Sequence, residues 1–151
     1  ERGLSESPLR IVADSRARTP PKARVLGPGC ILAVARSAPV ERLKLLSRNS
    51  EIICCGEDRV DLKEIFSLLH ERGIERIMVE GGASLNWSLV SQGLVDEIHV
   101  YMGPMLIGGE RAPTLLDGEG CRKDFPTLRL AAVERLDEGV LLKWTLAGEA
   151  P

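Results

Sequence analysis

The sequence predicts an α/β protein built on a mostly parallel central sheet flanked by helices. The chain has 151 residues, of which 44% are hydrophobic and 28% charged, enough for one domain with a buried core. Short aliphatic runs alternate with segments of helical periodicity, as in parallel sheets whose strands are joined by helices. Aromatic residues make up only 3% of the chain, so aliphatic side chains must form that core.

Strand and helix signals alternate through the first half of the chain. Aliphatic runs predict strands over residues 9–13, 30–35 and 51–54, and a short helix is expected over 39–47. The clearest helix is 61–72, where apolar residues recur at helical spacing. Asp61 can cap this helix, with Glu64 three residues on, and Gly73 can end it.

The second half begins with an expected buried strand over residues 76–80, followed by two glycines and a helix that ends at Gln92, before Gly93. Apolar and polar residues alternate over 96–102, which predicts another strand. Residues 103–126 are irregular and rich in glycine, and a loop of this length is typical of a functional segment. An antiparallel hairpin formed by 128–136 and 140–147 is expected to close the sheet.

Charge and composition narrow the classes of partner. The formal net charge is −2, so no global positive field exists to hold nucleic acid, and no apolar run approaches the length of a membrane span. The four cysteines form no C-x-x-C pair and the chain has only two histidines, which disfavours a zinc site. We therefore expect a small-molecule partner, no metal, no nucleic acid and no membrane. The polar start and unpaired cysteines favour a cytoplasmic protein.

The segment Ile77-Met-Val-Glu-Gly-Gly-Ala-Ser-Leu-Asn-Trp87 carries the strongest chemical signal. A strand that runs through two glycines into a helix N-terminus exposes several backbone N–H groups, which suit a phosphate or pyrophosphate. The alternative is a strand-to-helix turn that binds nothing. Neither the P-loop pattern nor the G-x-G-x-x-G fingerprint is present, so a nucleotide here would not be bound in a Rossmann fold.

Charged residues follow several of the predicted strands. Glu80 ends the 76–80 run, where its carboxylate could accept hydrogen bonds from a bound heterocycle; otherwise it is a solvated carboxylate. Arg16 and Arg18 follow the first strand, and Arg36 and Ser37 follow the second. Guanidinium groups at these positions could bind a 2′-phosphate or a substrate phosphate, although an arginine at the surface is more often only solvated.

One family shares a set of motifs spread from about Pro8 to the C-terminus. They are Arg10-Ile-Val-Ala-Asp-Ser15 with Arg18 and Pro20, Val79-Glu-Gly-Gly82 with Leu85, Leu94-Val-Asp-Glu97, Val100-Tyr101 with Pro104, Gly108-Gly109, and Ala112-Pro-Thr114 with Asp117-Gly-Glu-Gly120. In these motifs the chain resembles the riboflavin-biosynthesis reductase family. It is most similar to the archaeal stand-alone reductases, and next to the C-terminal reductase domain of the bacterial bifunctional deaminase-reductase.

The resemblance implies a dihydrofolate reductase-like fold and NADPH as the hydride donor. The implied reaction reduces the ribosylamino side chain of 2,5-diamino-6-ribosylamino-4(3H)-pyrimidinone 5′-phosphate to the ribitylamino form, by ring opening to an imine and hydride delivery to C1′. Two alternatives stay open. One is the same reduction of the deaminated 5-amino-6-ribosylamino-uracil 5′-phosphate, and the other is a non-catalytic NADP-binding or assembly module.

The resemblance also implies binding residues, although it assigns no catalytic residue. Glu80 matches a substrate-contacting position. The cofactor positions are Ser15, Arg16, Ala17, Arg18, Thr19, Val60, Gly82, Ala83, Ser84 and Leu85. Gly81 belongs to the same expected phosphate cradle, and we assign Arg36 and Ser37 to the 2′-phosphate from their position alone.

The family also differs from this sequence at the start. Its members begin with a strand that carries a Ser-Leu-Asp-Gly-like motif, a helix and an Asp-Asp-Pro-containing loop, none of which is present here. We therefore expect residues 1–151 to form a single reductase domain without roughly the first third of a family member, and to be a poor catalyst alone. The resemblance further implies a homodimer.

Overall fold

The computed structural model describes residues 8–110, 112–121 and 123–146. The chain divides into two compact units, the first ending at Ile77 and the second beginning at Met78. Together they contain a three-stranded parallel sheet, a three-stranded antiparallel sheet and three helices within the described residues. The α/β class that the sequence predicts is confirmed. No helix among the described residues is long and apolar enough to cross a membrane.

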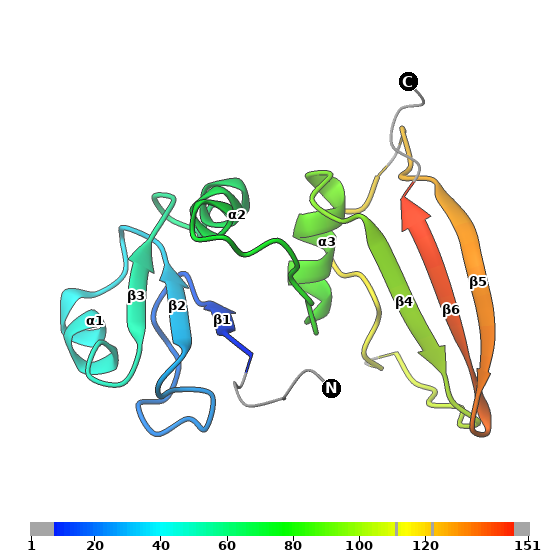
Figure 1. Ribbon diagram of the computed structural model, residues 1–151, viewed down its shortest axis with the longest axis horizontal. Coiled ribbons are helices and arrows are strands. Elements are labelled where there is room, and N and C mark those ends of the chain that lie inside the picture. The colour runs from blue at the N-terminus through cyan, green and yellow to red at the C-terminus, as the bar shows by residue number, and fades with distance from the viewer. Residues whose placement is uncertain (1–7, 111, 122, 147–151) are drawn as a thin grey trace. The chain divides into compact units, whose positions relative to one another are not determined.

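The first unit is built on a parallel sheet in the order β1-β2-β3 (Figure 1). Its strands are β1 (Arg10–Ala13), β2 (Cys30–Val34) and β3 (Glu51–Cys54). The helix α1 (Val40–Leu46) connects β2 to β3, and α2 (Leu62–Glu71) follows β3. All five elements begin and end within one residue of the bounds expected from the sequence, because each carries its own apolar pattern.

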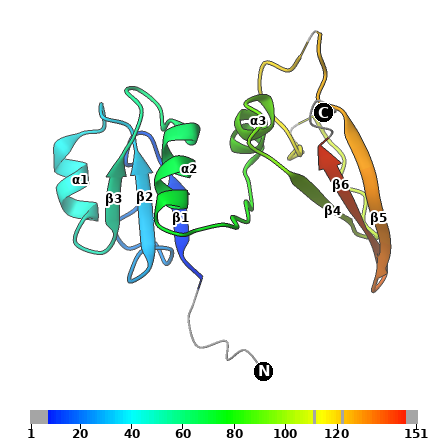
Figure 2. The same cartoon turned by 45° about the horizontal axis from the view of Figure 1, so that its top comes forward.

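The two helices cover opposite faces of this sheet, as Figures 1 and 2 both show. Ile31 and Ala33 of β2 pack towards Leu69 of α2, whereas Leu32 and Val34 pack towards α1. Successive strand residues point to opposite faces, so a central strand covered on both sides is apolar throughout. Every residue of β2 is accordingly buried.

The ends of α2 follow from the sequence. The Asp61 carboxylate accepts hydrogen bonds from the backbone N–H groups of Lys63 and Glu64, as an N-cap does. After the helix the chain turns at Gly73, whose φ is 79°. Glu64 was expected to complete a capping box, but its side chain instead contacts Gly56 and Arg36.

The second unit contains α3 (Ala83–Ser91) and an antiparallel sheet in the order β4-β6-β5. The strands are β4 (Glu97–Met102), β5 (Leu128–Leu136) and β6 (Gly139–Leu146). The predicted hairpin is confirmed: β5 and β6 pair from Leu128 opposite Leu146 to Leu136 opposite Gly139, with an irregularity between Leu130 and Ala132. Within the described residues the hairpin pairs with β4 and, contrary to the expectation, does not close the parallel sheet. The residues between 103 and 126 that the structure describes contain no helix or strand, which agrees with the expected loop.

The strand expected over residues 76–80 is wrong. This segment has no strand pairing, all five residues are exposed, and the Met78 side chain is 82% exposed. An apolar run becomes a strand only where a neighbouring strand supplies hydrogen-bond partners. Within the described residues β1 pairs only with β2, and β4 pairs only with β6. The run therefore lies in neither sheet.

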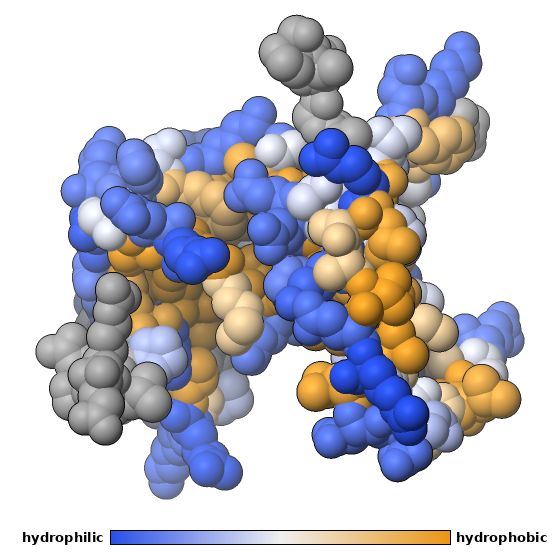
Figure 3. All heavy atoms as spheres, turned by 45° about the vertical axis from the view of Figure 1, so that its right-hand side comes forward, coloured by the Kyte–Doolittle hydropathy of each residue, from blue (hydrophilic) through white to orange (hydrophobic). Residues whose placement is uncertain are grey.

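Apolar side chains also lie at the surface of the second unit, and Figure 3 shows such side chains in orange on the face it displays. The exposed apolar residues on its strands are Tyr101, Met102, Leu128, Leu130, Val133, Leu136 and Val140. A surface of this kind is typical of a sheet that contacts another protein surface.

Candidate functional site

The predicted cofactor residues of the first unit lie where its three parallel strands end. Parallel strands present their carboxyl ends at one edge of a sheet, where open α/β folds bind ligands. The loops that follow the strands are joined by short hydrogen bonds. Ala35 N–H donates to the Ser15 carbonyl (3.2 Å), Arg36 N–H to the Gly56 carbonyl (2.9 Å), and Val60 N–H to Ser15 Oγ (3.0 Å). The structure thus brings Ser15, Arg36 and Val60 into one hydrogen-bonded edge.

The turn after β1 is held by Asp14. Its carboxylate Oδ2 accepts hydrogen bonds from the Thr19 N–H (2.6 Å) and hydroxyl (2.7 Å). Partial burial raises the pKa of Asp14, but hydrogen bonds from Arg18 and Thr19 and the positive charge of Arg18 outweigh it, so the pKa is lowered. The charged carboxylate is therefore the form that stabilises the turn.

Hydrogen bonds from the helix α1 also hold the turn after β1. Ala17 is fully buried and has a φ of 52°, an uncommon conformation for alanine. Arg42 of α1 donates from Nε to the Ala17 carbonyl (2.9 Å) and from Nη2 to the Thr19 carbonyl (2.8 Å). Arg16 and Arg18 remain exposed on the turn, so their guanidinium groups are accessible to an anion.

Arg36, which we assigned to a 2′-phosphate, lies between two carboxylates. Its Nη1 is 3.2 Å from Glu57 Oε1, and its Nη2 is 2.8 Å from Glu64 Oε1. The negative charge of Glu64 raises the pKa of Arg36. Slight desolvation opposes this effect, and the negative charge of Glu57 adds to it. The neighbouring Ser37 N–H donates to the Glu57 carbonyl (3.0 Å), which fixes the two loops together.

The glycine-rich cradle belongs to the second unit, at the start of α3. Gly82 is the N-cap residue, and among the described residues no side chain caps the helix. Gly81 has a φ of 102°, and the Gly81–Gly82 peptide bond is cis. Asn86 N–H donates to the Gly82 carbonyl (2.9 Å). The first N–H groups of α3 are thus left for an anion or solvent.

The loop that precedes β5 is anchored on this helix. Asp117 N–H donates to the Ala83 carbonyl (3.1 Å), and Asn86 Nδ2 donates to the Leu115 carbonyl (3.0 Å). Gly118 lies so close to the Trp87 ring that a Cβ there would overlap it. Two polar contacts and one aromatic contact therefore hold the loop against the residues that form the cradle.

Glu80 precedes this cradle in the irregular segment rather than at a strand end, and it is exposed. The expectation that it ends a strand is wrong for the reason given above for 76–80. Ser84 is exposed, whereas Ala83 and Leu85 are partly covered. The predicted residues therefore form two groups, one at the sheet edge of the first unit and one at the helix start of the second.

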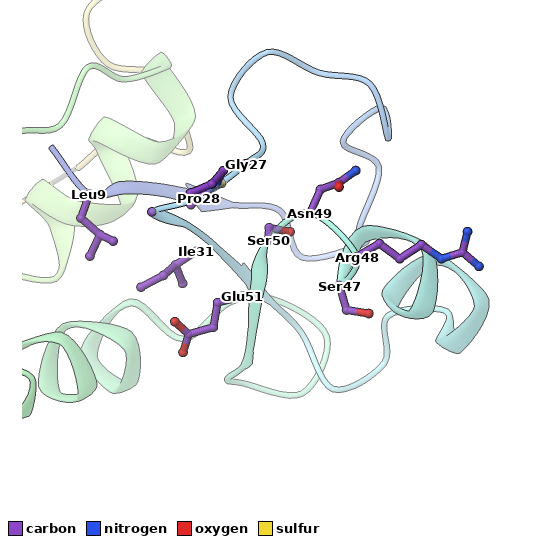
Figure 4. A pocket seen from close by; sticks show the side chains of 11 residues that line it. Leu9, Gly27, Pro28, Ile31, Ser47, Arg48, Asn49, Ser50 and Glu51 are labelled. Carbon is purple, nitrogen blue, oxygen red and sulfur yellow. The ribbon is translucent and has the colours of Figure 1, made fainter. Parts of the chain in front are cut away.

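The most evident pocket lies elsewhere in the first unit (Figure 4). It is open, with a volume of about 480 Å³, and Leu9, Cys30 and Glu51 mark it as lying at the amino ends of β1, β2 and β3. None of the predicted site residues lines it. Because parallel sheets bind ligands at the opposite ends of their strands, this pocket does not extend the candidate site.

Sequence comparison decides the family. The model of the RibD C-terminal domain matches residues 1–142. The chain belongs to the RibD C-terminal domain family. This agrees with the resemblance noted in the sequence motifs.

Two relatives of this RibD-type domain are named 2,5-diamino-6-ribosylamino-4(3H)-pyrimidinone 5′-phosphate reductase. The Methanothermobacter thermautotrophicus protein is 43% identical over 95% of this chain and 68% of its own length. The Archaeoglobus fulgidus protein is 44% identical over 91% of this chain and 62% of its own length. The chain thus spans about two thirds of the length of these two relatives. The crystal structure of a pyrimidine reductase-like protein from Corynebacterium diphtheriae superposes with a TM-score of 0.78, at 19% identity, covering 92% of this chain and 61% of that one.

Reductases of the RibD type suggest a nicotinamide cofactor, and the residues present suit part of one. The uncapped start of α3 fits an anionic group such as a pyrophosphate, and exposed Arg16 and Arg18 supply positive charge in the first unit. Arg36 is less suited to binding a phosphate of the cofactor, because its guanidinium already forms ion pairs with two carboxylates. Among the described residues no group of three or more His, Cys, Asp or Glu side chains could hold a metal ion.

Sequence reasoning missed the residues that hold this RibD-type site in shape. Asp14 and Arg42 fix the turn after β1, and Glu57 and Glu64 fix Arg36. Only Glu64 gave a signal, since its spacing from Asp61 marked it as important at the start of α2. That signal pointed to a capping box, whereas its actual partners lie 8 and 28 residues away in sequence.

Proposed function

We propose that this chain is the reductase part of a cytoplasmic enzyme of riboflavin biosynthesis. It would reduce the ribosylamino side chain of 2,5-diamino-6-ribosylamino-4(3H)-pyrimidinone 5′-phosphate to the ribitylamino form, with NADPH as hydride donor. The observation that carries the proposal is the hydrogen-bonded carboxyl edge of the parallel sheet, on which Ser15, Arg36 and Val60 meet. The names of the archaeal relatives supply the reaction.

Each group of residues has a role in this proposal. The backbone of Gly81–Leu85 would bind the pyrophosphate, and the turn from Ser15 to Thr19, with Val60, would bind other parts of the cofactor. Glu80 would accept hydrogen bonds from N–H groups of the pyrimidine. When bound, NADPH would supply the hydride that, together with a proton, reduces the C1′ imine of the opened sugar to an amine. The protein's contribution is position and charge.

The deaminated substrate, 5-amino-6-ribosylamino-uracil 5′-phosphate, is the alternative. The match to the RibD C-terminal domain favours it, because the bifunctional reductase domain shares the sequence motifs of this chain. The two pyrimidines differ by an amino group in one and a carbonyl oxygen in the other. A carboxylate such as Glu80 accepts hydrogen bonds, so it would favour the diamino form over the deaminated one.

The test combines binding and turnover. NADPH binding is measured by titration, and oxidation is followed by loss of nicotinamide absorbance with each pyrimidine in turn. We expect binding, slow turnover and faster oxidation with the diamino substrate. Faster oxidation with the deaminated substrate would favour the bifunctional reading, binding without oxidation would favour a non-catalytic module, and no binding would refute the proposal.

The variant Gly82→Val examines the cradle. A Cβ at Gly82 meets nothing within 4 Å, and its φ of −72° suits any residue, so the fold should tolerate valine. A bulky side chain there would block close approach of a phosphate, and we expect NADPH affinity to fall by about tenfold or more, about 1.4 kcal/mol. Gly108→Val is the matched control, since Gly108 also has open space around it. Equal affinities for the two variants would contradict the assignment.

The proposal includes a homodimer. The apolar side chains exposed on the β4-β6-β5 sheet, and the free outer edges of β4 and β5 within the described residues, support it. Light scattering on the purified chain measures the mass directly. A monomer at concentrations well above those of the activity assay would remove this part of the proposal.

A further inference from the structure

The two carboxylates that contact Arg36 differ in their exposure and in the number of contacts that they make. Glu64 is 35% exposed and uses both carboxylate oxygens: Oε1 contacts Arg36 Nη2 at 2.8 Å, and Oε2 accepts the Gly56 N–H at 2.8 Å. Glu57 is 80% exposed, and its side chain makes one contact, at 3.2 Å, to Arg36 Nη1. Glu64 is therefore part of the framework, whereas Glu57 is held to the guanidinium only loosely.

An anion that binds Arg36 must displace one of these carboxylates. A phosphate binds a guanidinium best through two parallel N–H bonds, which needs donors that are not already used. Because Glu64 also holds the Gly56 N–H, Glu57 is the group that can leave. Its backbone carbonyl accepts the Ser37 N–H at 3.0 Å, so the displaced carboxylate stays close to the guanidinium. Its negative charge would then repel the phosphate.

A ribose 2′-hydroxyl meets no such conflict. It is uncharged, and it can donate a hydrogen bond to a carboxylate that accepts only. The same Glu57 that opposes a 2′-phosphate is thus neutral or helpful towards a free 2′-hydroxyl. The two cofactors NADPH and NADH differ at this group, so the geometry bears on the choice between them.

We propose that Glu57 is a specificity-determining residue that limits the preference for NADPH over NADH by competing with the 2′-phosphate for Arg36. The inference rests on the proposed function, since it takes Arg36 as the residue that meets the adenosine ribose. It concerns the cofactor, and it holds for either pyrimidine substrate.

The experiment measures the dissociation constants of NADPH and NADH for the purified chain and for Glu57→Gln. Glutamine keeps the size of the side chain and removes its charge. We expect the ratio of the NADH constant to the NADPH constant to rise about fivefold, about 0.9 kcal/mol, with most of the change in NADPH. Circular dichroism confirms that the exposed substitution leaves the fold intact.

Two further variants isolate the cause. Glu41→Gln is the matched control, because Glu41 is 84% exposed and contacts Lys44 at 3.0 Å on α1, away from Arg36. It should leave the ratio unchanged. In an Arg36→Gln background, Glu57→Gln should raise the ratio less, because only direct repulsion of the phosphate remains and the guanidinium for which Glu57 competes is gone.

The outcomes separate this inference from the proposed function. If wild-type protein binds both cofactors but Glu57→Gln leaves the ratio as it was, or if Glu41→Gln changes it equally, Glu57 does not set specificity while the proposed function stands. If Glu57→Gln acts equally with and without Arg36, competition for that guanidinium is refuted. If wild-type protein binds neither cofactor, both proposals fail.

Discussion

Gly56 follows β3 and Cys55 in the candidate site and lies tightly against neighbouring backbone. Its φ is +72°, and a Cβ there would overlap the Arg59 carbonyl oxygen and lie 2.7 Å from the Asp61 nitrogen. Both neighbours are backbone atoms, so no side-chain rotation relieves the overlap. The substitution Gly56→Ala must displace the loop that carries Val60.

Gly73 provides a matched control for the magnitude. Its φ is +79°, close to that of Gly56, but nothing lies within 4 Å of a Cβ there. Gly73→Ala should therefore lower the free energy of unfolding only by the cost of placing alanine in a left-handed backbone conformation, about 1 kcal/mol. Gly56→Ala has the same cost, and it also displaces packed backbone, which costs about 1–3 kcal/mol more. We expect total losses of about 1 and 2–4 kcal/mol in the free energy of unfolding.

Urea unfolding followed by far-ultraviolet circular dichroism measures both losses. The midpoint should fall further for Gly56→Ala than for Gly73→Ala, at similar slopes. NADPH affinity should fall for Gly56→Ala alone, because the displaced loop includes Val60. Equal stabilities for the two variants would show that the loop yields freely, and the steric argument would be refuted.

Two further predictions concern the core and the turn after β1. Leu69 is 1% exposed, so Leu69→Ala should lower the free energy of unfolding by about 2–5 kcal/mol in urea titrations; a loss no larger than that of Leu130→Ala, at an exposed position, would contradict this. The pKa of Asp14 is lowered by folding, so its contribution is fully present above the pKa of an unfolded aspartate, about 3.9, and is lost as pH falls through the lower pKa of the folded state. Asp14→Asn should cost about 1 kcal/mol at about pH 7 and less at about pH 2, as measured by thermal unfolding; the same cost at both pH values would exclude a role for the charge.

The elements that could be predicted from the sequence are those whose signals are local. The helix α2 is an example, since its apolar spacing, the Asp61 cap and the turn at Gly73 all lie within thirteen residues. The hairpin of β5 and β6 is another, because its two strands are neighbours in sequence. Residues 76–80 have the same kind of apolar signal as β2. They form no strand because pairing depends on a partner that the run itself does not specify.

In the candidate site, too, some features could be predicted from the sequence and others could not. The positions of Ser15 and Arg36 after consecutive parallel strands could be predicted, because topology brings strand ends together. The partners of Arg36 could not, since Glu57 and Glu64 lie 21 and 28 residues away and nothing in their spacing indicates an ion pair. The role of Arg42 could not be predicted either. Its side chain donates hydrogen bonds to backbone carbonyls 23 and 25 residues earlier, and every residue type has a backbone carbonyl, so the sequence does not indicate these partners.

The hydrogen bond from the Val60 N–H to Ser15 Oγ ties together two loops that are 45 residues apart in sequence. The loop that carries Val60 therefore loses its conformational entropy when the chain folds. This entropy does not have to be lost again when a ligand binds. A site prepared in this way binds with less reorganisation, so a weakly interacting cofactor fragment should still find the loop in its bound shape. The serine hydroxyl would thereby contribute to affinity by holding the Val60 loop in place, in addition to any contact that Ser15 itself makes with the cofactor.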